Sequence, residues 1–184
     1  MKTIGIWLTS LLLAQNLAAY IYDESLLLIY AKIVPRIIAL DRTPHRIVSG
    51  RPTLCILYEK GDEKVAAALA SSIRRYTPSS REGGKPFEVT TLSYDRVEEC
   101  RGAISFLLMP TRDAKLRKAL KKAHREKILT FAYDKAMLGR GAVVSIHPGK
   151  RVYPLINIDV LKRDRLRLDP TLLQVAKIYR GDSK

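Results

Sequence analysis

Two cysteines, Cys55 and Cys100, are the residues whose chemistry this sequence constrains most. Cys55 lies in Thr53–Tyr58, a short and almost wholly apolar run, and Cys100 comes just before a second such run, Gly102–Met109. Continuous apolar runs of this length indicate strands covered on both faces, as in a parallel sheet. If these strands are neighbours, the cysteines can form a structural disulfide; the alternative is two buried free thiols. Redox catalysis usually needs closer spacing, such as Cys-x-x-Cys, which this chain lacks.

Other reactive side chains show no catalytic or metal-binding pattern. His45, His124 and His147 fall in a loop, on a basic helix and in a turn, and none has a second His or Cys at the spacing of zinc ligands. The chain has no Gly-x-Ser-x-Gly nucleophile motif, and its glycine-rich stretches match no phosphate-binding fingerprint. We therefore predict no catalytic residues, no metal ligands and no cofactor.

The formal net charge of +15 favours an anionic partner, such as nucleic acid, acidic lipid headgroups or an acidic protein surface. Basic side chains are densest over residues 112–127: Arg112, Lys115, Arg117, Lys118, Lys121, Lys122, Arg125 and Lys127. This segment is either the solvated face of an amphipathic helix or a face apposed to a membrane or an acidic partner. Single-stranded nucleic acid would require aromatic residues among the charges, and the segment has none, so we predict no nucleic-acid partner.

Residues 1–19 have the pattern of a secretory signal peptide. Lys2 precedes the apolar run Ile4–Leu13, and the small residues Ala18-Ala19 follow, so cleavage is expected after Ala19. Because apolar character continues to Ile21, an uncleaved anchor is the alternative. In both cases we expect an exported protein in an oxidising compartment, which permits a disulfide.

The remaining residues, 20–184, are enough for one domain and alternate strand and helix patterns. The predicted strands are Thr53–Tyr58, Phe87–Leu92, Gly102–Met109, Ile128–Ala132, Ala142–Ile146 and Val152–Ile158. The predicted helices are Asp23–Leu40, which Pro35 should end or kink near Val34, Glu63–Tyr76, Asp113–Glu126 and Thr171–Tyr179. This order predicts an α/β fold: a single three-layer domain with a mostly parallel central sheet, an antiparallel hairpin at one edge and helices on both faces.

The first predicted helix is apolar around more of its circumference than one core-facing stripe requires. A well-buried helix would explain this pattern, and so would a helix that carries a surface for an oligomer or a partner protein.

The C-terminal part of the chain resembles the signature of the YfiR-like family. The resemblance is carried by Ile156-Asn157-Ile158-Asp159, Leu166 and Leu172–Ile178. Further segments fit the family in the same order: Tyr30-Ala31-Lys32, Leu54-Cys55, Gly84–Val89, Glu99-Cys100, Ile128–Thr130 and Gly141–Val143. Two features depart from it: no Trp follows the early Pro35, and no second cysteine pair follows Cys100.

The resemblance implies a periplasmic regulator and not an enzyme. Such a protein would form a homodimer and bind the periplasmic domain of an inner-membrane diguanylate cyclase, or another membrane sensor protein, and repress it, lowering cyclic di-GMP signalling. We expect contact with an anionic membrane surface from the charge. The candidate partner or dimer residues lie on the first helix: Leu26, Ile29, Tyr30, Ile33 and Ile37. The alternative function is a periplasmic small-ligand-binding sensor domain that reports to a histidine kinase or a transporter.

Overall fold

The computed structural model describes residues 20–45, 51–77 and 86–180. The predicted signal peptide, residues 1–19, lies outside these ranges. The described ranges form one sheet with strand order β2-β1-β3-β4-β5-β6-β7. The strands are β1 (Thr53–Tyr58), β2 (Glu88–Ser93), β3 (Ala103–Leu108), β4 (Leu129–Ala132), β5 (Val144–His147), β6 (Tyr153–Asn157) and β7 (Lys177–Tyr179). Only β5 and β6 pair antiparallel among these described strands.

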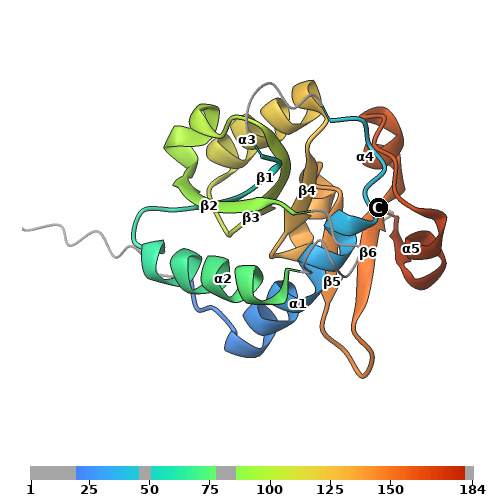
Figure 1. The fold of residues 1–184 in the computed structure, drawn as a ribbon, viewed down its shortest axis with the longest axis horizontal. Coiled ribbons are helices and arrows are strands. Elements are labelled where there is room, and N and C mark those ends of the chain that lie inside the picture. Colours follow the sequence, from blue (N-terminus) through green and yellow to red (C-terminus); the bar gives the residue numbers. More distant parts are fainter. Residues whose placement is uncertain (1–19, 46–50, 78–85, 181–184) are drawn as a thin grey trace, which may run out of the picture.

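Five α-helices and two 3₁₀ helices surround this sheet in the described ranges. They are α1 (Glu24–Ala39), α2 (Glu63–Tyr76), η2 (Tyr94–Glu99), α3 (Asp113–Glu126), η3 (Lys135–Arg140), α4 (Ile158–Arg163) and α5 (Pro170–Val175). Figure 1 shows α1 and α2 together on one side of the sheet and α3 on the other. The expected three-layer α/β domain with a mostly parallel sheet is confirmed.

Alternate side chains of each central strand enter two separate hydrophobic cores. In β1, Leu54 and Ile56 pack with α1 and α2, whereas Cys55 and Leu57 pack with α3 and η2. Successive strand residues point to opposite faces, so a strand covered on both faces must be apolar throughout. This explains the unbroken apolar run that marks Thr53–Tyr58 in the sequence.

Pro35 is expected from the sequence to end or kink the first helix near Val34. It does not end the helix, because α1 continues to Ala39. A proline inside a helix removes one backbone hydrogen bond. The residues beyond it offset this loss, since Ile37 and Ile38 are both buried in the core.

The predicted C-terminal end of the last helix, Tyr179, is also wrong. Asp169 caps α5 and Pro170 opens it, as expected, but the helix stops at Val175. Residues Lys177–Tyr179 instead form β7, parallel to β6. Pairing with an otherwise open strand edge outweighs local helix preference here, and the β5–β6 hairpin therefore lies one strand inside the edge of the sheet.

Candidate partner surface and disulfide

The N-terminus of α1 is held by hydrogen bonds from both sides. The carboxylate of Asp23 accepts from the backbone amides of Ser25 (2.8 Å) and Leu26 (3.1 Å), which makes it the N-cap. The preceding Tyr22 donates to Asp62 Oδ2 (2.6 Å) at the start of α2. Burial, together with the neighbouring Asp62 carboxylate, raises the pKa of Tyr22 well above its ordinary value. These contacts fix the direction in which α1 leaves the N-terminal segment.

The side chain of Tyr30 attaches the middle of α1 to the sheet. Its hydroxyl donates to the carbonyl of Ala132 and accepts from the amide of Ile146 (3.1 Å), and it lies 3.2 Å from Ser145 Oγ. Burial raises the pKa of Tyr30 to about 12, so the hydroxyl remains protonated and able to donate. Tyr30 therefore joins α1 to both β4 and β5.

The five residues expected on a partner surface separate into two groups. Tyr30 and Ile37 are buried in the core, with exposed fractions of 0% and 2%. Neither side chain reaches the surface, so a partner protein cannot contact it directly. Leu26, Ile29 and Ile33 are half-buried and pack against the edge of the same core.

Leu28, which the apolar pattern does not single out, is 43% exposed. Tyr76, at the end of α2, is 37% exposed, and Lys32 of α1 lies 5.5 Å above its ring. The group made of Leu26, Leu28, Ile29, Ile33 and Tyr76 is called the α1 surface below. A run of neighbouring leucines and isoleucines does not reveal which of them the sheet covers, so only the packing identifies this surface.

Cys55 and Cys100 form a disulfide, with their Cα atoms 6.5 Å apart. Both side chains are buried in the core between the sheet and α3. Cys55 lies in β1 and Cys100 directly follows η2, just before β3, and β1 pairs with β3 as expected for neighbouring strands. The bond therefore fixes η2 to β1, the strand next to the edge strand β2.

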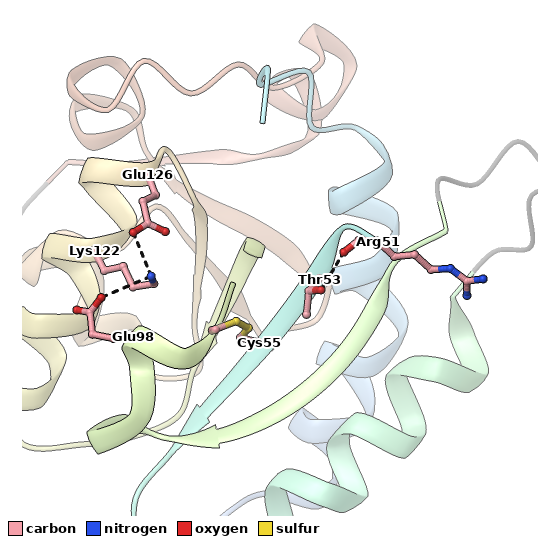
Figure 2. Close-up of a disulfide and its surroundings, with 7 residues drawn as sticks. Arg51, Thr53, Cys55, Glu98, Lys122 and Glu126 are labelled. Carbon is pink, nitrogen blue, oxygen red and sulfur yellow. Dashed lines mark hydrogen bonds and ion pairs between the residues drawn. A yellow bond between two sulfur atoms is a disulfide. The ribbon is translucent and has the colours of Figure 1, made fainter. Parts of the chain in front are cut away.

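Lys122 holds α3 against the same region. It is only 4% exposed, and its ammonium lies 3.0 Å from Glu126 Oε1 and 3.6 Å from Glu98 Oε2 (Figure 2). Glu98 belongs to η2, two residues before Cys100. Although burial acts to raise the pKa of Glu126, hydrogen bonds from Arg125 and Lys122 lower it overall. Lys122 thus serves as an internal ion-pair partner.

Most of the other residues of the basic cluster face solvent. Six of its members are exposed: Arg112, Arg117, Lys118, Lys121, Arg125 and Lys127. Lys115 is half-buried and bridges Glu59 (2.8 Å) and Asp95 (3.0 Å), and these two contacts raise its pKa. The amphipathic interpretation of residues 112–127 therefore describes most of the cluster, and Lys122 is its exception.

No group of three His, Cys, Asp or Glu side chains within the described ranges is arranged to hold a metal ion. A helix with the length and apolarity needed to cross a bilayer does not occur in residues 20–45, 51–77 or 86–180.

Two solved structures share the fold at low sequence identity. One is an ABC domain from Streptococcus pneumoniae in complex with L-Trp, with a TM-score of 0.57 and 9% identity over 81% of this chain. The other is a conserved domain protein from Vibrio cholerae O1 biovar El Tor, with a TM-score of 0.54 and 11% identity over 82% of this chain. In each case the match spans 60% of the other, longer chain. At these identities the likeness concerns the fold alone.

No curated protein matches this sequence. A family model does: the one described as YfiR/HmsC-like (DUF4154) matches residues 29–177. The matched segment begins in α1 and ends in β7, so it covers nearly all of the described fold. The chain therefore belongs to the YfiR/HmsC-like family.

Proposed function

We propose that this protein is a periplasmic repressor of an inner-membrane diguanylate cyclase, whose periplasmic domain it binds so that cyclic di-GMP signalling falls. The observation that carries the proposal is the family match over residues 29–177, because this family consists of regulators of such cyclases and not of enzymes. The buried disulfide between Cys55 and Cys100 supports export to an oxidising compartment, with residues 1–19 acting as the signal peptide.

The α1 surface is the proposed contact with the cyclase or with a second copy in a homodimer. Leu28 and Tyr76 are exposed apolar side chains, and Leu26, Ile29 and Ile33 are half-buried at the edge of the core. Exposed apolar side chains next to well-packed ones are typical of protein–protein contacts. Residues Tyr30 and Ile37 support this surface from beneath.

Repression requires the protein to bind the inactive state of the cyclase more tightly than the active state. A tenfold shift in the cyclase equilibrium needs a difference of about 1.4 kcal/mol between the two binding free energies. Exposed cations of α3, such as Lys118 and Arg125, would favour a position close to the anionic membrane surface beside the cyclase.

Two measurements test the proposal together. The purified protein should be retained by the immobilised periplasmic domain of the membrane diguanylate cyclase encoded next to it. Deleting the gene should raise cellular cyclic di-GMP, and restoring it should lower the level again. Absence of binding, together with unchanged cyclic di-GMP after deletion, would refute the repressor role.

A small-ligand sensor is a second candidate because of one pocket. A cavity of about 220 Å³ lies beside the residues that follow β4 and end β5, with Tyr133, Asp134, Lys135 and His147 among those that line it. Ligands of open α/β sheets bind at the carboxyl ends of strands. Asp134 and Lys135 also offer opposite charges for the two ends of an amino acid.

L-Trp is a suitable probe for this pocket, because the similar domain from Streptococcus pneumoniae holds that ligand. The melting temperature should rise with added L-Trp in the native protein and in Lys150→Ala, whose lysine is not among the residues that line the pocket. The rise should be reduced in Lys135→Ala. Equal responses in both variants would contradict a sensor role for this pocket.

A further inference from the structure

A second and larger pocket lies between α3, the end of η3 and α4. Its volume is about 420 Å³, within the range of small-ligand sites. Five of its seven lining residues carry cationic or titratable nitrogen groups, and none is acidic; the lining is Arg117, Leu120, Lys121, His124, Arg140, Gly141 and Arg163. Positive charge is therefore concentrated around this pocket.

One wall of the pocket is a single stripe of α3. Arg117, Lys121 and His124 are spaced four and three residues apart, which places them on the same helix face. Arg117 and Lys121 form no ion pair with any residue in the described ranges. Like charges four residues apart on a helix repel each other, so a bound anion would relieve an unfavourable arrangement.

The opposite wall holds two arginines whose positions are fixed by carboxylates. Asp164, 6% exposed, accepts from Arg163 Nε (2.6 Å) and lies 2.7 Å from His124 Nδ1, which joins α4 to α3. Arg140, the last residue of η3, pairs with Asp113 at the start of α3. Neither Asp164 nor Asp113 lines the pocket itself. The four cationic side chains that line it outnumber these two carboxylates, so the pocket keeps an excess of positive charge.

The backbone behind the pocket is held in place by one side chain, Asn157. Its amide nitrogen donates to the carbonyl of Leu138 in η3 (2.9 Å), and its side-chain oxygen accepts from the amide of Val160 in α4 (3.2 Å). Gly141 turns the chain after η3 at a φ of +112°, a conformation that favours glycine, and leaves that wall without a side chain. Both arginine-bearing elements are therefore joined before any ligand arrives.

We propose that this pocket binds a phosphate group. The fork of Arg117, unpaired within the described ranges, matches phosphate oxygens with paired hydrogen bonds, and Lys121 adds a point charge. Arg140 and Arg163, which already pair with carboxylates, add to the positive potential of the pocket. A single phosphate ion would leave much of the volume empty, so the natural ligand is a phosphorylated small molecule or the phosphate of a lipid headgroup. This site is separate from the α1 surface, and its occupancy does not depend on cyclase repression.

The test compares two double variants that remove the same charge from α3 and its N-cap residue. Arg117→Gln with Lys121→Gln removes the two unpaired pocket cations. Arg112→Gln with Lys118→Gln removes two exposed cations that do not line the pocket. Binding of glycerol 3-phosphate is measured by calorimetry at fixed salt, and binding to phosphatidylglycerol vesicles, against phosphatidylcholine vesicles, by co-sedimentation. Amide chemical shifts of the native protein locate the site independently.

The pocket variant should bind at least one of these probes about tenfold more weakly or worse, while the control variant stays within about twofold of the native protein. Selective loss of glycerol 3-phosphate binding identifies a soluble ligand, and selective loss of vesicle binding identifies a lipid headgroup. Amides of Lys121, Gly141 and Arg163 should shift on titration. Equal weakening in both variants would show diffuse charge attraction and overturn the proposal, as would binding to neither probe.

Discussion

The hydroxyl of Tyr30, in the middle of α1, donates a hydrogen bond to the carbonyl of Ala132 at the end of β4. The two residues are 102 positions apart in the sequence. This bond makes α1 part of the sheet's own hydrogen-bond network, so the buried face of α1 is structural and only its outer residues remain for a partner.

Tyr30→Phe should lower the free energy of unfolding by about 1–3 kcal/mol, because it removes a partner from the buried carbonyl of Ala132 and the amide of Ile146. Urea denaturation measures the change. Tyr20→Phe is the control, since that ring is 43% exposed, and it should change stability by less than about 0.5 kcal/mol. Equal effects of the two substitutions would contradict the role given to Tyr30.

Replacing both Cys55 and Cys100 with Ala should reduce stability by about 2–4 kcal/mol, because the disulfide closes a loop of 45 residues and restricts the unfolded chain. Urea unfolding with and without a reducing agent measures this loss. The reducing agent should destabilise the native protein and leave the double variant unchanged. A native protein that is insensitive to complete reduction would show that the bond adds no stability.

The carboxylate of Asp169 should make stability depend on pH in the acidic range. Hydrogen bonds from Thr171, and then the contact with Arg42, lower the pKa of Asp169 from its ordinary value of 3.8 to about 2. Because the folded-state pKa lies below the unfolded one, this stabilisation is complete above about pH 4 and is lost as the pH falls through about 2.

Asp169→Asn should flatten the dependence of the urea midpoint on pH between about 4 and 2, because asparagine keeps the N-cap of α5 but cannot titrate. At pH 7 the variant should be less stable than the native protein, since the interaction with Arg42 is lost. Parallel pH curves for the two proteins would rule out Asp169 as a source of the acid sensitivity.

Leu28→Glu should weaken binding to the periplasmic domain of the proposed cyclase partner by about tenfold or more, because it places a charge at the most exposed apolar position of the α1 surface. Val152→Glu is the matched control: Val152 is 42% exposed, close to the 43% of Leu28, but lies in the β5–β6 turn. Pull-down and surface plasmon resonance measure the affinities. If only Val152→Glu weakened binding to the cyclase domain, the contact would lie on the β5–β6 hairpin and not on the α1 surface.

The sequence by itself indicated six of the seven described strands, the two cysteines that could pair and the α/β class. An apolar run of six residues such as Thr53–Tyr58 indicates a strand covered on both faces, and Asp169-Pro170 is a local helix start. These patterns depend only on residues adjacent in the sequence, so they can be recognised without knowledge of the rest of the fold.

Only the tertiary structure decided which apolar residues of α1 face outward, how α1 continues past Pro35, and that Lys177–Tyr179 is a strand. It also brought Arg140 and Arg163 beside Arg117 and Lys121. Each of these outcomes depends on burial or pairing between segments far apart in the sequence, and such energies exceed the local preferences that a sequence pattern reports.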